Sequence, residues 1–164
     1  MAKKCETLQD FFDNLDQSFE KQKKWDKRFI EIAKVVSTWS SCLSRHVGCV
    51  IVKDRRIITT GYNGAPAGIK SCVERGYCLR ADSKSGDDLA HCYATHAEQN
   101  ALLQAAKLGV SVDGATLYCT TKPCSTCTKM IINSGIKRVC YINEYPDNFA
   151  GELFRESNIE VIKL

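Results

Sequence analysis

Two short segments carry side chains that bind transition metals and move protons. His96 and Glu98 stand two residues apart, and Cys124 and Cys127 stand three apart, directly after Pro123. Cysteines at positions i and i+3 of a helix lie on one face, so both sulfurs can reach one ion. The N-terminus of a helix also favours the thiolate, which is the form that binds metal.

A third ligand is available in His96, as a neutral imidazole. Three protein ligands leave one position of a tetrahedral zinc open to water, which is typical of a catalytic rather than a structural site. Glu98 is then placed to handle the proton of that water. His-x-Glu followed by Pro-Cys-x-x-Cys is the pattern of zinc-dependent nucleobase deaminases.

Each part of this pattern has another interpretation. A thioredoxin-like redox pair usually follows the first strand of its fold, whereas this Cys-x-x-Cys comes late. A structural zinc site would need a fourth ligand, usually from a second Cys-x-x-Cys, and none exists. A non-catalytic zinc module that binds a partner protein has no need of Glu98. We therefore predict a catalytic Zn²⁺ held by His96, Cys124 and Cys127, with Glu98 as the catalytic residue.

Length and composition fit one globular domain outside the membrane. The chain has 164 residues, of which 26% are charged and 44% hydrophobic. Its net charge of +4 suits a phosphorylated small molecule as well as nucleic acid. There is no apolar run of the length of a membrane span, and the basic residues near the start are not followed by an apolar stretch, so we do not expect a secretory signal. With ten cysteines and no export signal, we expect a cytoplasmic protein whose thiols are buried, free or metal-bound.

Hydrophobic periodicity predicts helices alternating with strands, and hence an α/β sandwich. We expect first an acidic amphipathic helix over 5–20 and then a second helix over 25–41. The apolar face of the first helix packs either on the core of the chain or on a partner subunit. Residues 63–95 show no convincing period, which usually marks a functional or disordered stretch. Further helices are expected over 96–108, 123–135 and 149–157, and strands over 47–53, 56–62, 115–120, 138–142 and 159–162.

The chain resembles the cytidine deaminase superfamily in His96-Ala97-Glu98 and Pro123-Cys124-Ser125-Thr126-Cys127. The run from Gly61 to Gly68 (GYNGAPAG) narrows the resemblance to the deoxycytidylate (dCMP) deaminase family. It covers residues 25–164 and leaves 1–24 as a helical extension of unassigned role. The resemblance implies a three-layer α/β/α fold around a five-stranded mixed sheet.

The same resemblance implies an activity and its control. Members convert dCMP to dUMP plus ammonia for thymidylate synthesis, and many are hexamers activated by dCTP and inhibited by dTTP. In that reaction water attacks C4 of cytosine, and Glu98 carries its proton to N3 and then to the leaving amine. We expect a homo-oligomer with no nucleic-acid or membrane partner. The sequence does not reveal whether dCTP or dTTP regulates this chain.

Three residues are assigned to substrate binding by the resemblance. Asn63 holds the nucleoside, Ala65 lines the same loop and Tyr145 lies near the nucleotide. Asn63-Gly64 is also a common turn dipeptide, so a purely structural role stays open. Donors for the 5′-phosphate are available in flexible segments, and the sequence does not choose among Arg45, Lys70, Arg75 and Arg80.

A second, structural zinc is a further expectation from the resemblance. Cys42 and Cys72 match positions where some dCMP deaminases hold such an ion, and His91 with Cys92 would complete the set. Cys78 is an alternative ligand, because adjacent side chains such as His91 and Cys92 diverge. The competing interpretation is that these residues are free thiols in a loop.

A tRNA adenosine deaminase shares the zinc motifs and is the main alternative function. Such an enzyme needs a basic surface for the RNA backbone. The mild net charge and the acidic first helix argue against it, as does the run from Gly61 to Gly68. A free-nucleoside cytidine deaminase would be expected to have Cys in place of His96.

Overall fold

A five-stranded mixed sheet forms the centre of the computed structural model, which describes residues 8–84 and 91–164 and, within the first helix, side chains from residue 17 onward. The order across the sheet is β2-β1-β3-β4-β5, with β1 antiparallel to β2 and β3, and β3, β4 and β5 parallel. The predicted mixed sheet is confirmed. The strands are β1 (Gly48–Lys53), β2 (Arg56–Tyr62), β3 (Thr116–Thr121), β4 (Arg138–Asn143) and β5 (Glu160–Lys163).

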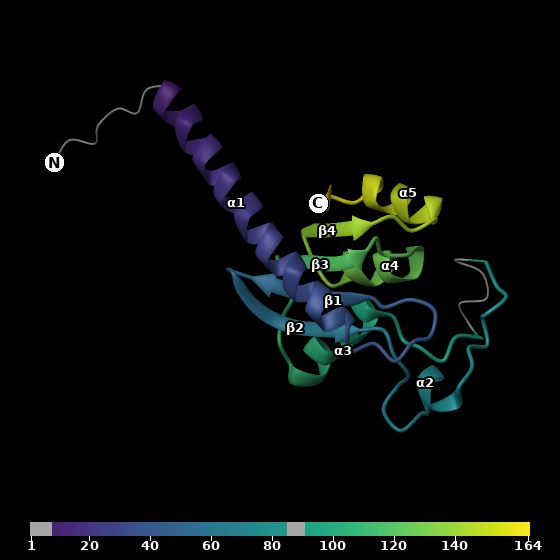
Figure 1. Cartoon of the computed structure of the whole chain (residues 1–164). Coiled ribbons are helices and arrows are strands. Elements are labelled where there is room, and N and C mark those ends of the chain that lie inside the picture. The colour runs from purple at the N-terminus through teal and green to yellow at the C-terminus, as the bar shows by residue number, and fades with distance from the viewer. Residues whose placement is uncertain (1–7, 85–90) are drawn as a thin grey trace.

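Helices cover both faces of this sheet, which confirms the predicted three layers (Figure 1). Helix α1 (Leu8–Ser37) packs Phe29, Ala33 and Val36 on one face, against Val50 of β1 and Tyr118 of β3. The opposite face, which carries the alternate strand residues, is covered by α3, α4 and α5. These helices are α3 (Ala97–Leu108), α4 (Ser125–Asn133) and α5 (Asn148–Glu156).

The prediction of two separate N-terminal helices is wrong, because α1 runs unbroken over 30 residues. The switch from acidic to basic residues at position 20 does not interrupt it. The junction contains no Gly or Pro, and Lys23 Nζ lies 2.9 Å from Glu20 Oε1 across it. None of the helices within the described residues, α1 included, is both long and apolar enough to span a membrane.

The first hairpin and one glycine position α3, the helix that begins directly after His96. Asp54 and Arg55 have φ of 51° and 60°, the two-residue turn that matches the strand twist. At the other end of β2, a Cβ on Gly61 would overlap the carbonyl oxygen of Ala97. Only glycine therefore allows α3 to lie this close to the strand, and it fixes the start of α3 beside the end of β2.

The segment between β2 and α3 contains, in its described part, one short α-helix, α2 (Cys72–Arg75), which the periodicity did not predict. Ser71 and Glu74 form a reciprocal capping box at its start. Gly64 and Thr95, near the two ends of the segment, exchange backbone hydrogen bonds of 2.9 and 3.2 Å. These hydrogen bonds hold the two ends of the segment together beside the start of α3.

Candidate active site

The three expected metal ligands lie together at the starts of α3 and α4. His96 is the N-cap of α3 and Cys124 the N-cap of α4, and Cys127 follows in the first turn. His96 Nδ1 lies 3.5 Å from Cys124 Sγ and 3.4 Å from Cys127 Sγ. Pro123 precedes the cap and is not the first helical residue as predicted, but the two sulfurs still share one face of the first turn.

These separations fit a zinc ion. Zinc bonds of about 2.3 Å to sulfur and about 2.0 Å to nitrogen, at tetrahedral angles, place the sulfur and nitrogen atoms about 3.5 Å apart. All three ligand atoms lie within 4.8 Å of one another. The donor set of two sulfurs and one imidazole nitrogen is one that zinc prefers.

The pKa values of the two cysteine thiols are shifted in opposite directions. A hydrogen bond from the Cys127 thiol lowers the pKa of Cys124 to about 4, against the effect of its burial. The pKa of Cys127 is raised, because its proton is held by Cys124 and the group is buried. Hydrogen bonding to Cys124 raises the pKa of His96. Binding a divalent cation here would displace the remaining thiol proton.

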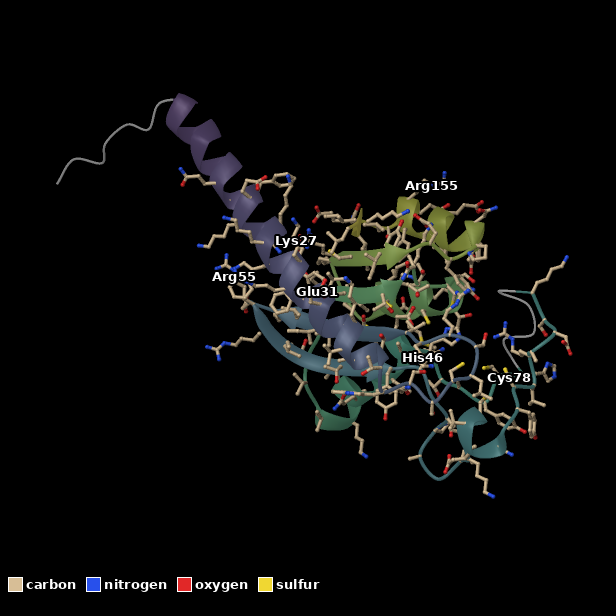
Figure 2. The ribbon with its side chains drawn as sticks, in the orientation of Figure 1. Lys27, Glu31, His46, Arg55, Cys78 and Arg155 are labelled. Atoms are coloured by element: carbon tan, nitrogen blue, oxygen red, sulfur yellow. The ribbon has the colours of Figure 1, made fainter. Side chains whose placement is uncertain are left out.

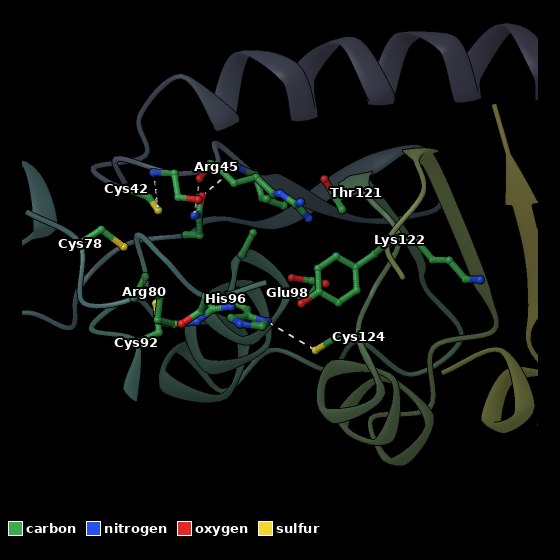
Figure 3. Close-up of a pocket in the computed structure, with 17 residues that line it drawn as sticks. Cys42, Arg45, Cys78, Arg80, Cys92, His96, Glu98, Thr121, Lys122 and Cys124 are labelled. Atoms are coloured by element: carbon green, nitrogen blue, oxygen red, sulfur yellow. Dashed lines mark hydrogen bonds between the residues drawn. The ribbon is translucent and has the colours of Figure 1, made fainter. Parts of the chain in front are cut away.

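Glu98 lies in the first turn of α3, beside the candidate ligands, and is only 4% exposed. Its burial raises the pKa of the carboxyl, although the nearby His96 acts in the opposite direction. Figure 3 shows His96, Glu98 and Cys124 directed toward one region of a cavity of about 180 Å³. A buried carboxyl next to a three-ligand metal site can take and return protons there.

Of the expected substrate residues, Asn63 and Tyr145 line this cavity and Ala65 is not among the lining residues. The Asn63 side chain donates to Arg45 O and accepts from Val47 N, both at 2.7 Å. It therefore holds the 45–47 loop in place, and one N–H and one lone pair of its amide remain for a ligand.

Two of the four candidate phosphate donors reach the cavity. Arg45 and Arg80 line it, and the Arg45 guanidinium lies 5.3 Å from the Tyr145 ring centroid. Lys70 and Arg75 do not line it, and Arg75 instead lies over the Tyr93 ring at 4.0 Å. Sequence reasoning missed Lys122, a lining residue whose position two before Cys124 was the available signal. Its ammonium group points away from His96 and Glu98 (Figure 3) and lies 3.9 Å from Glu144 Oε2.

A second group of thiols gathers beside the same cavity. Burial raises the pKa of Cys72, and the neighbouring thiols of Cys78, Cys42 and Cys92 raise it further. Three of these thiols also line the cavity, and Figure 3 labels them along one side of it. His91, the adjacent candidate, is exposed. Across the described ranges, only His96, Cys124 and Cys127 bring three ligand atoms within 4.8 Å of one another.

Comparison with known proteins agrees with this geometry. Residues 23–143 match the family model of the cytidine and deoxycytidylate deaminase zinc-binding region. The deoxycytidylate deaminase of Schizosaccharomyces pombe is 42% identical over 140 residues, covering 84% of this chain and 43% of that protein. That of Enterobacteria phage T4 is 37% identical over 168 residues, covering 82% of this chain and 87% of that protein.

A solved structure is similar over most of both chains. The dCMP deaminase of cyanophage S-TIM5, in complex with dCMP and dUMP, has a TM-score of 0.73 at 33% identity, covering 86% of this chain and 97% of that one. By contrast, this chain spans less than half the length of the fission yeast relative. With the zinc-ligand geometry, the fold and these matches in agreement, the chain belongs to the family of cytidine and deoxycytidylate deaminases.

Proposed function

We propose that the chain hydrolyses dCMP to dUMP and ammonia, as a zinc-dependent hydrolase acting on the C4–N bond of cytosine. The observation that carries this proposal is one cavity lined by His96, Cys124 and Glu98 together with two arginines. The similar cyanophage enzyme, which is described in complex with dCMP and dUMP, supports the same substrate.

His96, Cys124 and Cys127 would hold the zinc, which when bound supplies Lewis-acid activation of water. Glu98 accepts the proton of the attacking water and delivers it to N3 of the ring. As the C4–N bond breaks, the proton of the new C4 hydroxyl passes by way of Glu98 to the departing amine, so that ammonia leaves and C4 becomes a carbonyl. The remaining N–H and lone pair of the Asn63 side-chain amide orient the sugar. Tyr145 closes the cavity beside Arg45.

The 5′-phosphate is assigned to Arg45 and Arg80, which line the cavity from different loops. We expect Arg80→Ala or Arg45→Ala to raise KM for dCMP by roughly 10- to 100-fold, because each removes charge-assisted hydrogen bonds. Activity on deoxycytidine, which lacks the phosphate, should change little. Steady-state kinetics on both substrates measure this difference. Arg75→Ala is the matched control, and an equal KM effect there would contradict the assignment.

A second zinc is proposed on Cys42, Cys72, Cys78 and Cys92, with Cys78 in place of His91. Its support is that Cys42, Cys78 and Cys92 each lie near enough to the buried Cys72 to raise the pKa of its thiol, and that His91 is exposed. No three of these described sulfurs lie within 4.8 Å of one another, so binding an ion requires their side chains to move together. Four thiolates form a closed structural site.

We expect about two zinc ions per freshly purified chain by mass spectrometry of the metals. Cys72→Ser should reduce this count to about one and lower the melting temperature, since structural zinc contributes folding energy. His91→Ala should leave both unchanged. A count of one in the unsubstituted chain would exclude the second site.

Ultraviolet absorbance of dCMP turnover, with and without dCTP, tests the function directly. Turnover that rises with dCTP and falls with dTTP would support both the substrate and the regulation inferred from the family resemblance. A turnover rate that neither nucleotide changes would support the proposed reaction and contradict the proposed regulation. If zinc-loaded protein does not convert dCMP, the proposal fails and adenosine-containing RNA becomes the next substrate to test. A hexamer remains a prediction of the same resemblance, and a cytoplasmic location remains a prediction from the sequence.

A further inference from the structure

The carboxylate of Asp147 joins the starts of the neighbouring helices α4 and α5. Its Oδ1 accepts a hydrogen bond of 2.9 Å from the backbone N–H of Ala150, which is the ordinary bond of an N-cap residue to the first turn of its own helix, here α5. Its Oδ2 accepts one of 2.8 Å from the backbone N–H of Ser125, the first residue of α4, which lies 22 residues earlier in the chain. Capping of α5 does not account for this second bond.

Helix α4 is not capped by the residue that begins it. Its N-cap is Cys124, whose side chain makes no capping hydrogen bond and whose sulfur lies 3.5 Å from His96 Nδ1. The first backbone N–H groups of a helix have no partner within the helix, and the helix dipole favours an anion there. Asp147 therefore supplies a cap that Cys124 does not supply while its sulfur faces the candidate metal site.

Asp147 binds these two helix starts as an anion. Burial acts to raise the pKa of its carboxyl, but hydrogen bonds from the backbone of Ser125 and Ala150 outweigh burial and hold the pKa below its usual range. A hydrogen bond from an N–H group to an ionised carboxylate is stronger than one to a neutral acceptor. The link between α4 and α5 is therefore a strong one at neutral pH.

A tight turn connects Asp147 to Tyr145 of the cavity. The Asp147 N–H donates to Tyr145 O at 2.8 Å, which closes a three-residue γ-turn around Pro146. The proline ring fixes its own φ at about −65°, close to the value of an inverse γ-turn. Tyr145 therefore has little freedom relative to Asp147. The Tyr145 ring centroid lies 5.3 Å from the guanidinium carbon of Arg45, and both residues line the cavity.

We propose that Asp147 is a positioning residue, whose carboxylate fixes Tyr145 on the cavity wall relative to Cys124 at the candidate metal site. The connection passes from Cys124 to the N–H of Ser125, through the carboxylate, and along the γ-turn to Tyr145. Asp147 is not among the residues that line the cavity, so it acts through these neighbours. Its effect on turnover rests on the proposed function, whereas its effect on the position of Tyr145 does not.

Two substitutions break the bond between Asp147 and Ser125 from opposite sides. Asp147→Asn retains an oxygen that can cap α5 and places its amide N–H group against the N–H of Ser125. Ser125→Pro removes that N–H and leaves the charge of Asp147 in place. Proline is favoured at the first position of a helix, and Cys124 before it already has the extended backbone, with φ of −73° and ψ of 169°, that a following proline requires.

Two matched controls make the same kinds of change without breaking the bond. Ser125→Ala alters the same position but retains its backbone N–H. Asp54→Asn repeats the change from acid to amide in the exposed turn between β1 and β2. That turn includes Arg55, which Figure 2 shows far from Cys78 on the cavity wall.

Kinetics with excess zinc measure the effect on dCMP turnover. Asp147→Asn and Ser125→Pro should each lower kcat/KM at least about tenfold, because displacement of a binding group by about 1 Å is costly. The loss should lie mainly in KM, since Tyr145 binds the nucleotide and carries no proton. The double variant should be no worse than the poorer single variant, because both remove one bond.

The same kinetics in a Tyr145→Ala background separate positioning from stability. There Asp147→Asn should change kcat/KM by less than about threefold, because the group that it positions is already absent. An equal loss in both backgrounds, or a lower melting temperature with unaltered kinetics, would show that Asp147 only stabilises the fold and would overturn the proposal. Both controls should keep the kinetics of the unaltered chain.

Fluorine NMR follows the position of Tyr145 without substrate. In protein labelled with 3-fluorotyrosine, the resonance of Tyr145 is the one that is missing from Tyr145→Phe. Asp147→Asn and Ser125→Pro should both shift or broaden this resonance, and the two controls should not. An unmoved resonance in Ser125→Pro, which retains the charge of Asp147, would overturn the proposal. If the unaltered chain does not convert dCMP, the proposed function fails, and this resonance alone decides whether Asp147 positions Tyr145.

Discussion

Replacing Glu98 by glutamine is expected to lower kcat for dCMP deamination by roughly 10²- to 10⁴-fold, the range of general acid–base catalysis. Glutamine keeps the size of the buried side chain but cannot carry a proton between water, N3 and the leaving amine. Because Glu98 is not one of the three ligands, the zinc content should stay that of the unaltered chain. Absorbance kinetics and metal analysis of the same preparation provide the two measurements.

Two comparisons make this result specific. Glu152→Gln makes the same chemical change on an exposed face of α5 and should leave kcat unaltered. A Glu98→Gln protein that keeps its zinc and turns over at a near-normal rate would remove Glu98 from the mechanism. Loss of zinc together with activity would instead show that the carboxyl supports the ligands.

The grouping of the three candidate metal ligands with Glu98 was predictable because short-range geometry fixes most of it. Cys124 and Cys127 belong to one helical turn, and Glu98 is two residues from His96. A pattern of two or three residues therefore contains most of the arrangement, and only the meeting of the two helix starts depends on the fold. Because β2 and β3 both pair antiparallel with β1, they end at the same edge of the sheet, and this pairing together with the close approach of α3 to Gly61 brings those two starts together.

The cavity residues that lie outside the candidate metal site could not be predicted in the same way. Arg45, Arg80 and Tyr145 come from three loops with no shared period, so no local pattern distinguishes them from Lys70 or Arg75. The single helix α1 was missed for another reason. A change of charge sign was interpreted as an element boundary, although nothing in the backbone chemistry of residues 20–25 stops a helix.

A buried ionic network was likewise beyond prediction, because its members are far apart in the chain. Asp26 of α1 accepts two hydrogen bonds from Arg138 of β4, at 2.7 and 2.8 Å, and one from the Tyr118 hydroxyl at 2.7 Å. Gln22 adds a fourth at 2.9 Å. Asp26 is 2% exposed and the Arg138 side chain 14%. This network joins α1 to β3 and β4 at the point where the helix leaves the sheet.

Breaking this network from one side should produce the largest loss of stability among the variants considered. Arg138→Met leaves the Asp26 carboxylate buried without its partner, and we expect the free energy of unfolding at neutral pH to fall by about 3–5 kcal/mol. Chemical denaturation measures the change. Lys34→Met, which removes an exposed ion pair with Glu31 on the same helix, should cost under about 1 kcal/mol. The double variant Asp26→Asn with Arg138→Met should recover part of the loss, because the amide is neutral and still accepts from Tyr118.

The pH dependence of this loss separates a lost charge pair from lost packing. Burial acts to raise the pKa of Asp26, but hydrogen bonds from Arg138, Tyr118 and Gln22 outweigh it and hold the pKa below its usual range. A carboxyl with a lowered pKa in the folded state contributes stability above its unfolded pKa of about 3.9, and this contribution is lost as pH falls through the folded value. In Arg138→Met the unpaired carboxyl should instead take up a proton readily. The stability difference between Arg138→Met and the unaltered chain should therefore shrink as pH falls from neutral. The change should begin above about pH 4, where the carboxyl of the variant takes up its proton, and continue down to the lowered pKa of Asp26 in the unaltered chain. A difference that stays constant from neutral pH to pH 3 would attribute the effect to the lost volume of the arginine side chain and not to its charge.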